Sequence, residues 1–155
     1  VNTLKRVAAT EIISLPSAII IAWLAARTDM PGRKVLDFLK KHPAVEEVIF
    51  PLDPTYPQYE LARKQMKGAS GLISFFLRAE KAEEIETFCE SLRHIRMAVS
   101  WGGHESLIIP KMAGIPVADF NPAERTHRMC RLYVGLEEPD HLIADIDQAL
   151  AKGMG

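Results

Sequence analysis

The stretch Gly71–Leu77, which reads GLISFFL, constrains the fold more than any other part of the sequence. A short apolar run of this kind, with almost no polar position on either side, is typical of a fully buried strand. Such a strand belongs inside a sheet, because both of its faces need a cover. The chain must therefore build a sheet around residues 71–77.

Further strand and helix patterns surround this run. We expect other strands at Val45–Phe50, at Ile95–Ser100, at Ser106–Ile109 on an edge of the sheet, and at Cys130–Gly135. Helices are expected at Arg33–Lys41, Gln58–Met66, Ala79–His94 and Pro139–Lys152. This order predicts an α+β fold, a two-layer sandwich in which helices cover one face of a small, mostly antiparallel sheet, preceded by N-terminal helices. What covers the other face stays open.

The N-terminal part of the chain is strongly apolar. Ser17–Arg27 is apolar nearly all round, which predicts a buried helix. The apolar run Leu15–Ala26 is about 12 residues long, too short to span a bilayer. A secretory leader is the alternative, but Lys5, Arg6 and Glu11 come before the run and disfavour it.

The composition indicates a soluble, cytoplasmic domain without a strongly charged partner. The chain has 155 residues, a formal net charge of −1 at pH 7 and 25% charged residues. Nucleic acids and anionic membranes usually require a basic patch, so neither is expected as a partner. Cys89 and Cys130 lack CxxC or CxxH spacing, and we expect them to be core residues.

Motifs for metal binding or nucleophilic catalysis are absent from the sequence. No two histidines are four residues apart and no HExxH frame occurs, so no metal site is expected from His42, His94, His104, His127 and His141. There is no GxSxG elbow, and Gly102-Gly103 is a lone glycine pair rather than a phosphate-binding loop.

Arg131 is the residue that points to a binding site. It lies inside the strand-like run CRLYVG, where an unpaired charge would cost several kcal/mol to bury. If Cys130, Leu132 and Val134 face one side, then Arg131, Tyr133 and Gly135 face the other. The guanidinium would thus lie on one surface with a phenol, and its fork of N–H groups matches a carboxylate.

Ser100 offers the second half of such a site. It ends a predicted strand just before Gly102-Gly103, where its hydroxyl and nearby N–H groups could hold the same anion. The alternative is that Arg131 pairs with an internal Asp or Glu, and spacing alone favours that alternative.

Four segments of the sequence, in order and spacing, resemble one known family. They are HPAVEEVIFP, YPQYELARKQMKGASGLISFFL, AVSWGGHESLIIP and NPAERTHRMCRLYVGLEEPDHLIADIDQAL. Together they are similar to the C-terminal region of the cysteine/methionine-metabolism family of enzymes that depend on pyridoxal 5'-phosphate (PLP). This family has the aspartate-aminotransferase fold type and includes cystathionine γ-synthase, the cystathionine lyases and methionine γ-lyase. The resemblance covers about His42 to Leu150.

The resemblance implies a role for two residues of this chain. Arg131 would bind the substrate α-carboxylate, and Ser100 would lie beside it. With the resemblance, the hypothesis of a ligand site is therefore favoured over the alternative of an internal ion pair. The lysine that binds PLP covalently belongs to a larger domain, and no lysine of this chain lies in the family's Ser-x-x-Lys context. We therefore expect no catalytic, cofactor-binding or metal-binding residue here, PLP in the intact parent protein and none in this fragment.

The resemblance also implies the domain organisation. Residues 1–41 would be a helical segment leading to the missing PLP-binding domain, and residues 42–155 the C-terminal α+β domain. Several family residues are lacking near Met30-Pro31. Other departures are Tyr59 for a histidine, Ile109 for the histidine of a His-Pro pair, and Trp101 for a smaller or aliphatic residue. The resemblance places these three positions near the site that would contact the substrate side chain, so they concern substrate specificity.

The sequence therefore predicts the carboxylate-binding part of a PLP-dependent lyase or transferase. Its substrate would be a small sulfur amino acid or an O-acyl homoserine-like relative, and the intact protein would be a homo-oligomer, a dimer or tetramer. The fragment alone would be inactive, and visible absorbance of lysine-bound PLP in it would contradict this. The alternative is a stand-alone, non-catalytic interaction or oligomerisation module derived from the same family.

Overall fold

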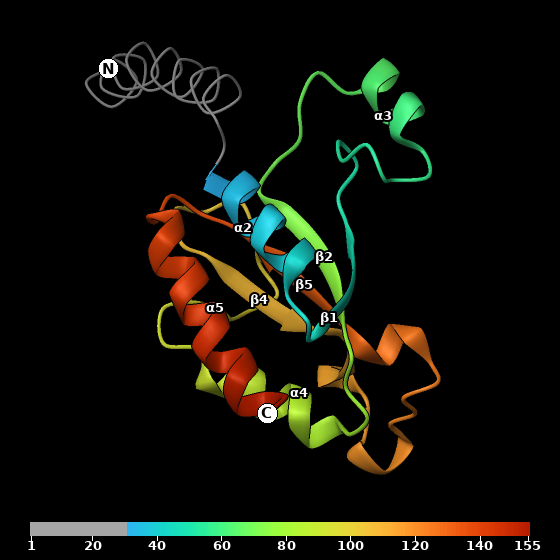
Figure 1. Ribbon diagram of the computed structural model, residues 1–155, viewed down its shortest axis with the longest axis vertical. Helices are drawn as coiled ribbons and strands as arrows, with labels where there is room; N and C mark the ends of the chain where they lie inside the picture. Colours follow the sequence, from blue (N-terminus) through green and yellow to red (C-terminus); the bar gives the residue numbers. More distant parts are fainter. Residues whose placement is uncertain (1–30) are drawn as a thin grey trace, which may run out of the picture. The chain divides into compact units, whose positions relative to one another are not determined.

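The computed structural model describes residues 31–155 and shows a two-layer α+β fold (Figure 1). One layer is a five-stranded sheet with the strand order β1-β2-β5-β4-β3. The strands are β1 (Val45–Ile49), β2 (Leu72–Leu77), β3 (Arg96–Met97), β4 (Leu107–Pro110) and β5 (Met129–Tyr133). Neighbouring strands are antiparallel, except for the parallel pair β3 and β4. The predicted fold class is confirmed, while the helix expected at residues 17–27 lies outside the described residues.

Three helices form the second layer, and Figure 1 shows them on one face of the sheet. They are α2 (Pro31–Lys41), α4 (Ala82–Ser91) and α5 (Pro139–Gly153). A shorter helix, α3 (Tyr59–Gln65), lies in the connection from β1 to β2 and stands away from this layer. Three short 3-10 turns between β4 and β5 are η1 (Lys111–Gly114), η2 (Val117–Asp119) and η3 (Arg125–Arg128).

The core lies between the sheet and the helices, and strand alternation decides which residues enter it. In β2 the side chains of Ile73, Phe75 and Leu77 are buried, as are Cys130 and Leu132 in β5. The helices contribute the buried side chains of Val35, Leu39, Phe88, Leu142, Ile146 and Leu150. Burying a side chain of this size contributes about 1.5–3 kcal/mol, so this face anchors the sheet. Both cysteines are buried, as predicted.

A buried carboxylate joins α5 to the chain that leaves α4. Asp145 is 2% exposed, and its oxygens accept hydrogen bonds from the backbone N–H groups of Arg93, His94 and Ile95 at 2.8–3.2 Å. Burial raises the pKa of Asp145, but these N–H donors outweigh burial and hold the pKa below its usual 3.8. The contact fixes the direction in which the chain enters β3.

Two strand predictions are wrong in detail. The strand expected over Ile95–Ser100 pairs only at Arg96 and Met97, because the chain then leaves the ladder after the hydrogen bond from Ala98 N to Ile108 O. β4, expected at an edge, lies between β5 and β3, and its Leu107 and Ile108 are buried. The edge strand is instead β3.

Helix α2 packs on the same core as the rest of the described chain. Val35 and Leu39 are fully buried, and α2 contacts both α5 and β1. The domain boundary expected between residues 41 and 42 stays a prediction, since it concerns a segment that begins outside the described residues.

Candidate functional site

Alternation along β5 places Arg131 and Tyr133 on the face of the sheet away from the helices. Cys130, Leu132 and Val134 are buried on the helix side, whereas Arg131 and Tyr133 are partly exposed. Arg131 pairs with Ser74 of β2 on one side and with Ile109 of β4 on the other. The guanidinium therefore projects from the middle strand of the sheet. It lies on the face opposite the helices, for which the sequence predicted no covering element.

The loop of residues 98–106 lies against this open face and contacts both side chains. A guanidinium N–H of Arg131 donates to the Val99 carbonyl at 3.3 Å, and the Tyr133 hydroxyl donates to the Gly103 carbonyl at 3.0 Å. Gly102 has φ +93°, a backbone conformation that glycine adopts without strain. The glycine pair is thus a turn that brings the loop back to the sheet.

The far end of the loop is fixed by a carboxylate. Glu137 accepts hydrogen bonds from the backbone N–H and the hydroxyl of Ser106, each at 2.7 Å. Burial raises the pKa of Glu137, but the bonds from Ser106 outweigh it and hold the pKa below its usual 4.5. Gly135, expected to share a surface with Arg131, is buried beneath the loop, where a Cβ would lie 2.3 Å from the His104 carbonyl oxygen. No sequence signal marked Ser106 and Glu137 as a pair.

A hollow of about 290 Å³ opens beside Arg131. Its described walls are mainly apolar and include Val99, Ile109 and Met129, and Arg131 and Lys111 add two cations from the same part of the chain. Among residues 31–155, no acidic residue lines it. An apolar cavity with a guanidinium on its wall suits a small molecule that carries a carboxylate.

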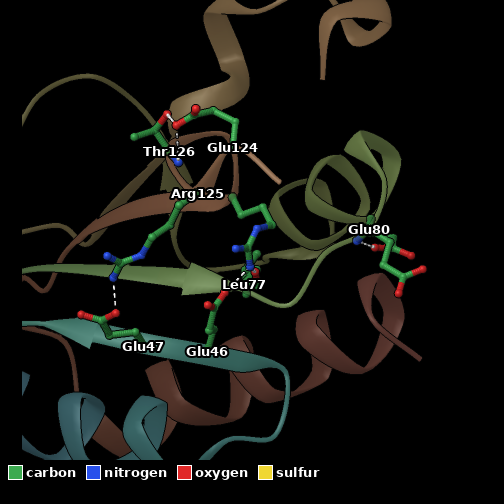
Figure 2. A network of polar contacts seen from close by, with 9 residues as sticks. Glu46, Glu47, Leu77, Glu80, Glu124, Arg125 and Thr126 are labelled. Atoms are coloured by element: carbon green, nitrogen blue, oxygen red, sulfur yellow. Dashed lines mark hydrogen bonds and ion pairs between the residues drawn. The ribbon is translucent and has the colours of Figure 1, made fainter. Parts of the chain in front are cut away.

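Arg131 differs from two other arginines near the same sheet. Arg125 forms an ion pair with Glu47, and Arg128 forms one with Glu46 (Figure 2). Within residues 31–155, no carboxylate lies within ion-pair distance of Arg131. The ion-pair alternative for Arg131 thus has no partner in the described part of the chain.

Ser100 lies close to Arg131 in the loop but makes no hydrogen bond to it. Its side chain is exposed, and it follows Val99, whose carbonyl accepts the hydrogen bond from Arg131. Among the contacts of residues 31–155, the Ser100 hydroxyl makes no hydrogen bond, so its role beside Arg131 stays a prediction. Trp101, which departs from the family pattern, has its ring centre 4.3 Å from the guanidinium carbon of Arg131. A stack between loop and strand leaves no signal in sequence spacing.

The described residues also bear on metals and membranes. In residues 31–155, no group of three His, Cys, Asp or Glu side chains is arranged to hold a metal ion. None of the described helices is long and apolar enough to cross a bilayer.

Comparison with known proteins places the chain in a family. The model of the family described as Cys/Met metabolism PLP-dependent enzyme matches residues 25–151. This chain belongs to that family. Cystathionine gamma-lyase of Sus scrofa is 41% identical over 123 residues, which are 77% of this chain and 30% of that protein. L-methionine gamma-lyase of Treponema denticola is 41% identical over 126 residues, 78% of this chain and 31% of that protein.

A solved structure agrees with these relatives. Cystathionine gamma-lyase from Lactobacillus plantarum, complexed with L-serine, has a TM-score of 0.67 and 35% identity over 80% of this chain and 33% of that chain. The chain thus spans about a third of the length of the family members it matches. The resemblance inferred from the sequence motifs is confirmed.

The described residues suit a substrate carboxylate better than the PLP of this family. Among the described residues that line the hollow, Lys111 alone has an amine, and none has an acid that could bond a pyridine nitrogen. Lys40 is already paired with Asp53 at 2.6 Å. Arg131, on the wall of this hollow, has the donor geometry that a carboxylate requires.

Proposed function

We propose that this chain is the substrate-carboxylate-binding part of a PLP-dependent lyase or transferase. The substrate would be a sulfur amino acid or an O-acyl homoserine-like relative. The observation that carries the proposal is Arg131, a guanidinium without an acidic partner in the described residues, on the wall of an apolar hollow. Family membership supports the same class of substrate.

Arg131 would bind the α-carboxylate through two parallel N–H···O bonds. Ser100 would donate its hydroxyl to the same group, and the apolar walls would receive the rest of the substrate. Fixing the carboxylate fixes the direction of the bonds at Cα, and such alignment is a large part of enzymatic rate enhancement. When bound in the intact protein, PLP supplies the electron sink that permits elimination or replacement at Cβ or Cγ.

Other features of the proposal rest on the sequence and the resemblance. We propose that the intact protein is a cytoplasmic homo-oligomer, a dimer or tetramer, which binds neither nucleic acid nor membrane. The PLP-binding lysine would lie outside these 155 residues, so that this chain alone holds no PLP and turns over no substrate.

The test is the substitution Arg131→Lys in the full-length protein. It keeps the charge but removes the fork, and we expect KM for L-methionine or L-cystathionine to rise about 10- to 100-fold, the cost of one or two charge-assisted hydrogen bonds. Keto acid release measures turnover. The matched control is Arg125→Lys, which changes another exposed arginine near the same sheet face and should leave KM within about two-fold. An unchanged KM in Arg131→Lys would contradict the carboxylate role.

A further inference from the structure

Lys111 places a second cation at the hollow beside Arg131. It begins η1 directly after β4 and lines the hollow of about 290 Å³ together with Val99, Ile109 and Arg131. Strand alternation explains this position, because Ile109 is on the open face beside Arg131, Pro110 is buried toward the helices, and the next residue returns to the open face. Lys111 therefore belongs to the same surface as the guanidinium.

The backbone at Lys111 is fixed by its neighbours, while the residue itself is exposed. Pro110 pairs with Cys130 of β5, and the Met112 side chain is 4% exposed in the core. The backbone N–H of Ile115 donates to the Met112 carbonyl at 2.8 Å and closes the 3-10 turn. The lysine side chain thus starts from a fixed point beside the hollow.

The charge of Lys111 has no acidic partner in the described part of the chain. Lys40 pairs with Asp53, whereas among residues 31–155 no carboxylate lies within ion-pair distance of Lys111. An ammonium is a compact charge with three N–H donors, and it binds one anionic group without the fork of a guanidinium. A lysine and an arginine on the wall of one apolar hollow therefore fit a ligand with two anionic groups.

Lys111 and Arg131 approach the hollow from different points of its wall. In the strand register Arg131 lies opposite Ile109, and Lys111 follows Ile109 by two residues, about 7 Å along a strand. Ile109 and Met129 contribute apolar surface to the same wall. A ligand with methylene groups between two carboxylates can place one charge at each cation and its carbon chain against the apolar wall.

We propose that Lys111 is a specificity-determining residue that selects substrates with a second carboxylate at the end of the side chain. Its ammonium binds this distal carboxylate while Arg131 binds the α-carboxylate. Amino acids with a neutral end lack the contact with Lys111 and bind more weakly. The inference deepens the proposed function and rests on it, since it takes Arg131 as the group that binds the α-carboxylate.

The experiment measures the binding of two matched amino acids to the full-length protein by isothermal titration calorimetry. L-2-Aminoadipate and L-norleucine have carbon chains of equal length, but the former ends in a carboxylate and the latter in a methyl group. We expect the wild type to bind L-2-aminoadipate about five-fold or more tightly than L-norleucine, because it gains a charge-assisted contact.

The substitution Lys111→Met keeps most of the side-chain length and removes the charge. It should raise Kd for L-2-aminoadipate about 5- to 20-fold and change Kd for L-norleucine less than about two-fold, because one charge-assisted contact is lost. Lys111→Arg keeps a cation and should stay within about three-fold of the wild type for both amino acids. Lys152→Met is the matched control, since Lys152 is exposed near the end of α5 and does not line the hollow. It should leave both Kd values within about two-fold of the wild type.

The outcomes separate this inference from the proposed function. Equal Kd values for the two amino acids in the wild type, or an equal change for both in Lys111→Met, overturn the specificity role. If Arg131→Lys raises both Kd values and Lys111→Met changes neither, only this inference fails. If Arg131→Lys changes neither Kd, or the wild type binds neither amino acid, the proposed function fails and this inference with it.

Discussion

Two corners of the sheet carry arginines in opposite circumstances. At the corner beside β1, Arg128 pairs with Glu46, and Arg125 pairs with Glu47, the second pair being labelled in Figure 2. Toward β4, Arg131 has a tryptophan ring and a backbone carbonyl but no carboxylate among the described residues. The two paired arginines connect η3 to β1, whereas Arg131 contacts a ring and a carbonyl and has no acidic partner in residues 31–155. On the function proposed above, the difference is between arginines that pair with acids of the same chain and an arginine that would bind a ligand.

The comparison predicts that substitution of a charged residue lowers the free energy of unfolding more when that residue has more hydrogen-bond or ion-pair partners within the chain. Asp145 is the extreme case, because three backbone N–H groups and Gln148 donate to it. We expect Asp145→Asn to lower the free energy of unfolding by roughly 2–4 kcal/mol, since the amide presents an NH₂ group to N–H donors. Urea unfolding of the full-length protein followed by circular dichroism measures this loss.

The pH dependence of the free energy of unfolding provides a second test of the role of Asp145. Its folded pKa is held below 3.8, so its contribution is present above that pH and is lost as the pH falls through the lower, folded value. Asp145→Asn should therefore flatten the loss of stability in acid. Wild-type stability at neutral pH in this variant would show that the buried carboxylate is not needed.

Arg128→Met should have a smaller effect. Arg128 donates to the Leu77 carbonyl at 2.9 Å as well as to Glu46, and its side chain is 14% exposed. We expect a loss of about 1–2 kcal/mol in the free energy of unfolding, because the Leu77 carbonyl loses its side-chain donor while Glu46 can return to water. If the proposed function holds, KM of the full-length protein should not change. A large rise in KM with unchanged stability in Arg128→Met would show that Arg128, and not only Arg131, serves the substrate.

Much of the fold was predictable because local patterns determine it. The alternation in residues 130–134 identified the buried and open faces of β5, and the apolar run at 71–77 identified β2 as an internal strand. The parallel pairing of β3 with β4 was not predictable, since it depends on where Asp145 of a distant helix directs the chain. Arg131 stood out because a charge inside an apolar strand is costly. Its stack on Trp101 joins residues thirty apart and left no periodic signal.

We propose above that Arg131 binds a carboxylate from outside the chain. A crystal structure of the full-length protein with L-serine bound tests this most directly. We predict both carboxylate oxygens of L-serine within about 2.7–3.2 Å of the Arg131 guanidinium nitrogens. An Asp or Glu of the protein in that place, with the L-serine carboxylate bound elsewhere, would show that Arg131 does not bind the substrate carboxylate.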